Sequence, residues 1–233
     1  MYEVDEALLL LLAPDVLITQ THCEVCAVSP ADLAHLAVAE RQREQVVALS
    51  TGTLADILQG FLDVARVLGR PAAGAALVAE IRARLGALSD KTRALPRPSL
   101  VCLEWIEPAF AMGNWGPELV ELAGANNLLG TRGVHSTSTP WAAVRDANPD
   151  LLVVAACGFG LERALAEMDW LSAQPGFCDL AAVRAGRVFV ADGNLYFNRS
   201  GPLLFDTPLI LAEMIHPEHF APAHEGRIWR RFS

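Results

Sequence analysis

A single long helical stretch in the middle of the chain limits the folds that the sequence can adopt. Pro71 opens this stretch, it continues to Leu95, and Pro96 and Pro98 then end it. A helix of about 24 residues is roughly 36 Å long, which is the width of a small domain. Long helices between two α/β segments often act as struts, so we expect this helix to join two lobes.

Strand and helix patterns alternate on both sides of this helix. Runs rich in apolar, β-branched and aromatic residues predict strands at 16–19 and 45–50 before it, and at 99–104, 151–156 and 188–191 after it. Strands that alternate with helices are typical of parallel sheets. The sequence therefore predicts an α/β fold of two lobes with parallel sheets, joined by one long backbone helix.

We divide the chain at this helix into a partial N-terminal α/β lobe (1–70), the backbone helix (71–95) and a C-terminal α/β lobe (96–233). The first lobe has only two predicted strands, which is small for a stable sheet. An acidic helix start also follows Met1 almost at once, so we expect the first lobe to be incomplete at its amino terminus. The apolar run Leu8–Leu12 is too short to span a membrane and lacks the flanking positive charge of a signal peptide, which predicts no export signal in this chain.

The composition indicates a protein with a large apolar core. Apolar residues make up 52% of the 233 residues, charged residues 19%, and the formal net charge is −9. An acidic chain without a cluster of Lys and Arg argues against nucleic acid as a partner. The five cysteines are an odd number in mixed contexts, which does not fit a disulfide scaffold.

Aromatic side chains gather where α/β folds bind ligands, beyond the carboxyl ends of parallel strands. Five of them follow predicted strands of the second lobe or open its next helix: Trp105, Phe110, Trp115, Tyr196 and Phe197. Large flat side chains at one sheet edge suit a large, partly apolar, planar ligand, and ordinary packing under loops is the alternative. Trp141 and Trp170 lie on predicted helices, and we assign them to packing.

Cys23 and Cys26 form a CxxC motif beside His22, which can be redox-active or hold half of a zinc site. Zinc would need two more ligands, and apart from His22 and His35 the usual second pair is missing. We therefore favour a structural loop and predict no metal site, with a metal or redox role as the alternative.

Two other motifs have ordinary structural interpretations. Gly158-Phe-Gly160 lacks the spacing of a phosphate loop and predicts a tight turn between strand and helix. His216-Pro-Glu-His219 has a metal-like spacing but predicts a helix terminus beside Pro217. No nucleophile, base and acid occur in a catalytic order, so we predict that the protein is not an enzyme.

Two carboxylates follow strands at the same sheet edges as the aromatic residues. Glu24 lies in the first lobe and Glu162 in the second. Exposed carboxylates at the tips of two lobes could dock Arg side chains of a partner, and solvated surface charge is the alternative for each. Glu162 also suits the first turn of a helix, where it would interact with the helix dipole.

The chain resembles the cobalamin-binding members of the periplasmic substrate-binding proteins that serve iron-complex and vitamin B12 importers. The resemblance covers nearly the whole chain. It rests on residues 19–28 (TQTHCEVCAV), 103–110 (LEWIEPAF), 113–124 (GNWGPELVELAG), 149–154 (PDLLVV) with 157–159 (CGF), and 182–194 (AVRAGRVFVADGN).

This resemblance implies two Rossmann-like lobes bridged by one long helix, with a corrinoid held in the cleft between them as transported ligand and no resident cofactor. It implies that Trp105, Phe110, Trp115, Tyr196 and Phe197 contact the ligand. One Glu in each lobe would dock the permease dimer of an ABC transporter, with Glu162 in the second lobe and Glu24 in the first. The protein would be a monomer in the periplasm or cell envelope.

Two alternatives stay open beside the corrinoid importer. A ferric siderophore or haem is the first, because Arg132, Arg145 and Arg199 could bind an anionic ligand. A cytoplasmic metal or redox protein that uses Cys23 and Cys26 is the second. The chain also departs from the family pattern, since the usual Arg-Pro-Gly-Pro reads Arg199-Ser-Gly-Pro202.

Overall fold

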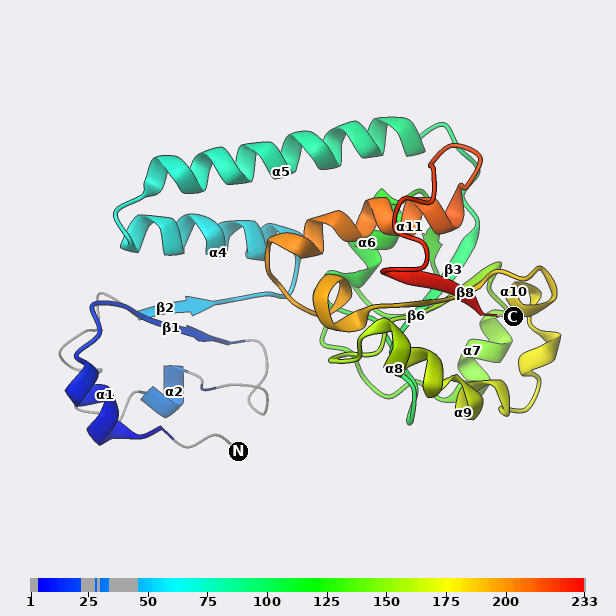
Figure 1. Ribbon diagram of the computed structural model, residues 1–233, viewed down its shortest axis with the longest axis horizontal. Helices are drawn as coiled ribbons and strands as arrows, with labels where there is room; N and C mark the ends of the chain where they lie inside the picture. Colours follow the sequence, from blue (N-terminus) through cyan, green and yellow to red (C-terminus); the bar gives the residue numbers. More distant parts are fainter. Residues whose placement is uncertain (1–3, 22–27, 29, 34–45, 233) are drawn as a thin grey trace. The chain divides into compact units, whose positions relative to one another are not determined.

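The computed structural model describes residues 4–21, 28, 30–33 and 46–232, and Figure 1 shows its elements. The chain divides into two compact units, residues 1–82 and 83–233, and the boundary falls inside helix α5 (Pro71–Thr92). Each unit contains parallel strands and helices. The three-part division predicted from the sequence places its boundaries elsewhere, at 70 and 95, and stays a prediction.

The first unit contains a parallel pair of strands and the helix that follows them. Strands β1 (Leu17–Gln20) and β2 (Val46–Leu49) pair in parallel, as the alternating pattern predicts. The unit also holds α1 (Glu6–Leu12), α2 (Pro30–Leu33) and α4 (Leu54–Val67). Thr53 and Asp56 form a capping box at the start of α4, which satisfies two backbone donors that the first turn leaves free.

Helices α4 and α5 run side by side in the first unit (Figure 1). A side chain at Gly74 of α5 would lie 2.4 Å from Ala65 Cβ of α4, so the glycine permits this close approach. Helix α5 ends at Thr92, earlier than the predicted end at Leu95. Leu95 donates its backbone N–H to the Thr92 carbonyl at 3.1 Å, and Pro96 disfavours helical geometry for Leu95.

The second unit is built on a six-stranded sheet with the order β4-β3-β6-β7-β8, and β5 pairs with β3. Its strands are β3 (Ser99–Trp105), β4 (Phe110–Ala111), β5 (Asn126–Asn127), β6 (Leu151–Val154), β7 (Val188–Ala191) and β8 (Trp229–Phe232). The central strands β3, β6 and β7 are parallel, whereas β4 and β8 pair antiparallel at the two ends. The carboxyl ends of the three central strands therefore lie at one edge of the sheet.

Helices cover both faces of this sheet (Figure 1). One side carries α6 (Gly116–Leu122) and α11 (Thr207–Ile215), and the other carries α7 (Trp141–Ala147), α8 (Leu161–Ala166), α9 (Met168–Ser172) and α10 (Ala181–Arg184). Strands β6 and β7 are buried along their whole length, as expected for a parallel sheet with helices on both faces. The predicted α/β fold is confirmed.

The elements between β6 and β8 are mostly short. Glu167 ends α8 and begins α9, so residues 161–172 form two short helices. Residues Gly193–Phe197 form a π-helical turn, η3. Two 3₁₀ turns, η2 (Phe177–Asp179) and η4 (Pro202–Asp206), lie in the connections. Strand β8 was not predicted.

A buried carboxylate fixes the segment that leads into β8. Glu213 of α11 is only 2% exposed, and its carboxylate accepts hydrogen bonds from three donors. These are the backbone N–H of His224 at 3.1 Å, the His224 ring Nδ1 at 2.6 Å and the Trp229 ring Nε1 at 3.1 Å. Every donor comes from the segment 224–229, so the carboxylate ties the last strand to α11.

Candidate functional site

The connections that leave the central strands pack against one another at the carboxyl edge of the second unit's sheet. The backbone N–H of Cys157 donates to the Glu104 carbonyl at 2.8 Å, which joins the ends of β3 and β6. The backbone N–H of Asn194 donates to the Phe159 carbonyl at 3.1 Å, which joins the segments after β6 and β7. We call these segments, residues 104–115, 155–160 and 192–199, the ligand edge.

Gly193 lets two of these segments approach closely. A Cβ atom at this position would lie 2.2 Å from the Ala156 carbonyl oxygen and 2.5 Å from the Ala155 carbonyl oxygen. The Asn198 side chain bridges the same two segments, because its Nδ2 donates to the Ala155 carbonyl at 2.8 Å and to the Gly193 carbonyl at 3.0 Å. Glycine is therefore required here, because a side chain would clash with the backbone carbonyls of the segment after β6.

The turn that carries Tyr196 and Phe197 is held by side chains on three sides. The Asp192 carboxylate accepts from the Leu195 backbone N–H at 2.8 Å and caps the turn. The Thr207 hydroxyl donates to the Tyr196 carbonyl at 2.5 Å, and the Trp115 ring Nε1 donates to the Phe197 carbonyl at 2.9 Å. The two aromatic residues are thus fixed in place by backbone contacts.

The five aromatic residues that were predicted to bind the ligand differ in how much of each is exposed to solvent. Trp105 is 36% exposed, and Phe110 and Tyr196 are half-buried. Trp115 is 7% exposed and Phe197 is fully buried. The first three reach the surface and can contact a ligand directly, whereas the last two support the ligand edge from inside.

The Trp105 ring is held at the end of β3 by two contacts. Its Nε1 donates to the Glu107 carbonyl at 3.0 Å, and its ring meets the Phe159 ring edge-on with centroids 5.2 Å apart. The Arg163 guanidinium in turn lies 3.7 Å from the centroid of Phe159. A flat apolar surface fixed in this way can stack on a ligand without losing much conformational freedom.

A polar cluster beside the aromatics was not predicted from the sequence. Burial raises the pKa of the Glu104 carboxyl above its ordinary value, and a hydrogen bond with the Ser136 hydroxyl opposes the rise. Ser136 is itself buried and accepts from the Gly113 backbone N–H at 2.8 Å. Desolvation raises the pKa of the Cys157 thiol although the residue is exposed overall, and the Glu104 carboxylate adds to that rise. The thiol is therefore held in its neutral form.

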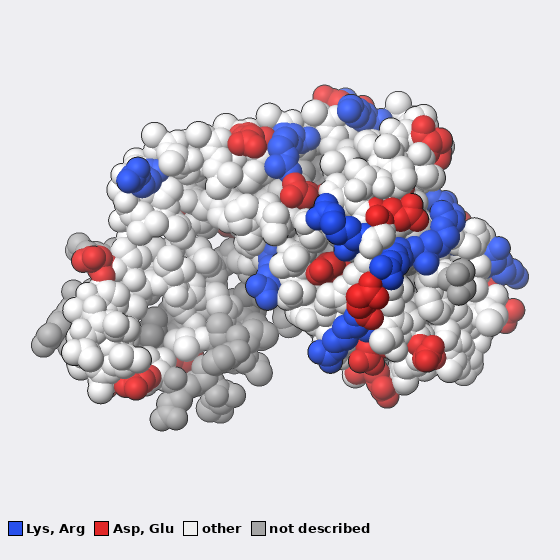
Figure 2. All heavy atoms as spheres, viewed as in Figure 1, with Lys and Arg blue, Asp and Glu red and all other residues white. Residues whose placement is uncertain are grey.

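Of the two predicted docking carboxylates, the structure describes Glu162 but not Glu24. Glu162 lies in the first turn of α8, its side chain is 76% exposed, and it pairs with Arg230 at 2.8 Å. Such pairs keep charges of the two signs mixed on the face shown in Figure 2, where acidic and basic side chains lie next to one another over the second unit. Glu24 lies outside the described residues, as do Cys23, Cys26, His22 and His35.

The remaining sequence motifs have structural roles. Gly158 has φ of +76° and turns the chain between β6 and α8, and His216 ends α11, as predicted. Trp141 and Trp170 pack against the buried core, which confirms their assignment to packing. Among the described residues, no group of three or more His, Cys, Asp or Glu side chains could hold a metal ion.

The three arginines considered for an anionic ligand already have partners. Arg132 pairs with Glu118 at 2.8 Å and Arg145 with Asp146 at 2.9 Å. The Arg199 guanidinium donates to the Asn194 side-chain oxygen at 2.8 Å. Of the three, Arg199 is the one on the ligand edge.

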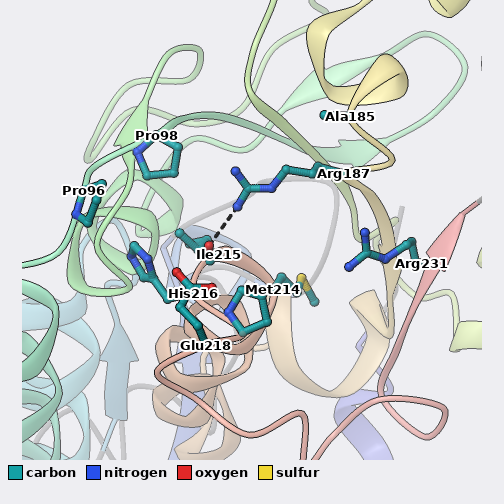
Figure 3. Close-up of a pocket in the computed structure, with 10 residues that line it drawn as sticks. Pro96, Pro98, Ala185, Arg187, Met214, Ile215, His216, Glu218 and Arg231 are labelled. Atoms are coloured by element: carbon teal, nitrogen blue, oxygen red, sulfur yellow. Dashed lines mark hydrogen bonds between the residues drawn. The ribbon is translucent and has the colours of Figure 1, made fainter.

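A hollow lies at the opposite edge of the same sheet, where the parallel strands begin. It is a cavity of about 390 Å³ whose lining includes Pro98 before β3, Arg187 before β7, and Arg231 of β8 (Figure 3). Arg187 donates to the Ile215 carbonyl at 2.8 Å, and Arg231 donates to the Gly186 carbonyl at 2.7 Å. Arg187 therefore joins the start of β7 to the end of α11, and Arg231 joins β8 to the turn before β7.

Half-exposed aromatics at the carboxyl edge of a parallel sheet lie where α/β proteins bind ligands. The periplasmic binding protein family matches residues 5–195, and the chain belongs to this family. Its class is that of the substrate-binding components of ABC transporters, which are not enzymes, so the prediction of a non-enzymatic protein is confirmed. None of the curated proteins matches the chain.

Solved structures share the fold at low sequence identity. A periplasmic haem-binding protein from Pseudomonas aeruginosa has 22% identity and a TM-score of 0.77 over 99% of this chain and 81% of its own. A haem-binding protein from Roseiflexus has 23% identity and a TM-score of 0.70 over 92% and 80%. An ABC transporter substrate-binding protein from Listeria monocytogenes has 16% identity and a TM-score of 0.73 over 91% and 81%.

Family membership implies a periplasmic location, as the sequence resemblance did. In the described part of the chain, no helix is both long enough and apolar enough to cross a membrane.

Proposed function

We propose that this protein binds a corrinoid of the vitamin B12 type and delivers it to the permease of an ABC importer. The observation that carries the proposal is the fixed, half-exposed Trp105 ring at the ligand edge, with Phe110 and Tyr196 as further half-buried aromatics. Such surfaces suit a large, flat and partly apolar ligand. The sequence motifs that resemble cobalamin-binding relatives support the corrinoid over other planar chelates.

Calorimetric titration of the full chain with cyanocobalamin tests this proposal. We expect saturable binding of one corrinoid per chain. Haemin and a ferric siderophore serve as comparison ligands, because solved structures of similar fold include haem-binding proteins. Binding of haemin or siderophore with no binding of the corrinoid would contradict the choice of ligand and support the haem or siderophore alternative.

We propose in addition that Glu162 docks an Arg side chain of the permease. Its carboxylate is exposed, and its present partner Arg230 is also at the surface, so an arginine of the permease can replace Arg230 at little cost. Glu24 stays a prediction for the first unit.

Glu162→Gln is expected to reduce corrinoid uptake by cells that carry the complete importer by about tenfold, since a charge-assisted pair is lost. Corrinoid binding by the purified protein should stay unchanged. Glu167→Gln is the matched control, because Glu167 is an exposed carboxylate at the other end of the same helix. Equal uptake by the two variants would contradict docking through Glu162.

A further inference from the structure

An apolar groove lies in the second unit between the last turns of α5 and the start of α11 (Figure 1). Its volume is about 270 Å³. Leu88, Phe205 and Phe220 are the buried side chains of its wall, and Leu85 and Leu209 add further apolar surface. We call this hollow the α5 groove. It shares no lining residue with the ligand edge, so it is a separate place on the molecule.

Leu209 stands out among the residues of α11. The other residues of this helix, from Thr207 to Ile215, are buried, whereas Leu209 is 41% exposed. Its side chain lines the α5 groove. A ligand chain in the groove would cover Leu209 and remove apolar surface from water, which favours binding.

The charged side chains that line the groove are both cations, and they differ in their partners. Arg84 and Lys91 are two turns apart on one face of α5, roughly 10 Å along the helix axis. Asp206 pairs with Arg84 and neutralises that end of the groove. Lys91 is exposed, and in the described part of the chain none of the ion pairs includes it. The Lys91 end therefore carries a positive charge that no carboxylate balances.

An apolar wall with a positive charge at one end complements a molecule that has an apolar chain and a negatively charged head. The volume of about 270 Å³ lies just below the range of pockets for drug-sized ligands, which is about 300–1,000 Å³. The groove therefore suits one flexible chain better than a corrinoid or another large planar ring system.

We propose that the α5 groove binds a single-chain anionic amphiphile of the fatty acid type, with its carboxylate beside Lys91 and its chain against Leu88, Leu209 and Phe220. This binding goes beyond the proposed solute transport and does not rest on it, because the groove uses residues outside the ligand edge.

Calorimetric titration of the full chain with dodecanoate, kept below its micelle concentration, tests the proposal. We expect saturable binding of one dodecanoate per chain and weaker binding of dodecan-1-ol, which has the same chain length without the charge. Lys91→Gln should raise the Kd of dodecanoate about threefold to fivefold, the usual size of an exposed charge pair, and leave that of dodecan-1-ol unchanged. Arg82→Gln is the matched control, because Arg82 is an exposed cation of α5 that does not line the groove.

A second variant tests the apolar part of the groove. Leu209→Gln should raise the Kd of both ligands about tenfold, because the chain loses part of its apolar contact surface. Leu203→Gln is its matched control, since Leu203 is 45% exposed in η4 and does not line the groove. Thermal unfolding of each variant checks that the fold is kept.

Lys91 is the only lysine of the chain, so its acylation by an amine-reactive reagent reports directly on one end of the groove. Mass spectrometry of the digested protein follows the rate, and we expect saturating dodecanoate to slow the reaction severalfold. Bound dodecanoate with an unchanged acylation rate would place the ligand elsewhere and overturn the proposal.

Three other results would also overturn it. The first is no saturable binding of dodecanoate, and the second is equal dodecanoate affinity of Lys91→Gln and the wild type. The third is binding to vesicles of anionic phospholipid without binding of monomeric dodecanoate, which would make the groove a contact with a membrane surface instead.

Discussion

Glu213→Ala is expected to lower the free energy of unfolding by about 3 kcal/mol or more, because it leaves several hydrogen-bond donors without their acceptor and each buried unsatisfied donor costs about 1–3 kcal/mol. The substitution removes one acceptor and leaves three donors without it: the His224 N–H, the His224 ring and the Trp229 ring. The Trp229 ring is only 3% exposed, so water cannot replace the lost partner without opening the structure. The last strand, β8, should loosen first because all three donors lie in the segment that leads into it.

Urea unfolding followed by circular dichroism measures this loss, and hydrogen exchange over residues 224–232 locates it. Glu121→Ala is the matched control, because Glu121 is an exposed glutamate on α6 and makes the same change of side chain. Glu213→Gln should lie between the wild type and Glu213→Ala, since an amide oxygen keeps part of the acceptor function. A loss below about 1 kcal/mol for Glu213→Ala would show that the network is not stabilising.

The elements that the sequence predicted well are those whose apolar pattern is also their burial pattern. Helix α4 repeats apolar residues at helical spacing and buries Leu54, Ile57 and Leu58. Strands β6 and β7 are continuous apolar runs and are buried on both faces. In these segments local preference and tertiary packing agree, so the apolar pattern alone is sufficient to predict the element.

The elements that were missed depend on contacts that are distant in sequence. Strand β8 contains two consecutive arginines, so its sequence lacks the apolar pattern that predicts a strand. It forms because it pairs antiparallel with β7 and because Glu213 fixes the segment before it. The turn η3 is likewise held by Thr207 and Trp115, which lie in other elements.

The candidate site was predicted as a group of residues but not as an arrangement. The sequence places Trp105, Trp115 and Phe197 near strand ends, yet only the structure separates the half-exposed Trp105 from the two buried residues. Glu104 was missed because a single carboxylate at the end of a strand is usually solvated. Its hydrogen-bond partner Ser136 lies in another connection, which the sequence alone does not bring next to it.

Trp105→Ala is expected to weaken corrinoid binding by about 30-fold or more, since aromatic residues at the centre of a binding surface commonly contribute about 2 kcal/mol or more. Its ring is already fixed by the Glu107 carbonyl and by Phe159, so stacking a ligand on it requires little ordering of the side chain. Because the ring is 36% exposed in the free protein, its removal should have a smaller effect on stability than on affinity.

Trp115→Phe is the contrasting variant, because it keeps an aromatic ring and removes the hydrogen bond to the buried Phe197 carbonyl. It should lower the free energy of unfolding by about 1–3 kcal/mol by leaving that acceptor unpaired, and change corrinoid affinity less than Trp105→Ala does. Calorimetry with cyanocobalamin and thermal unfolding of both variants measure the two effects. If Trp105→Ala binds the corrinoid within threefold of the wild type, the ligand does not stack on Trp105, and the observation that carries the proposed function is lost.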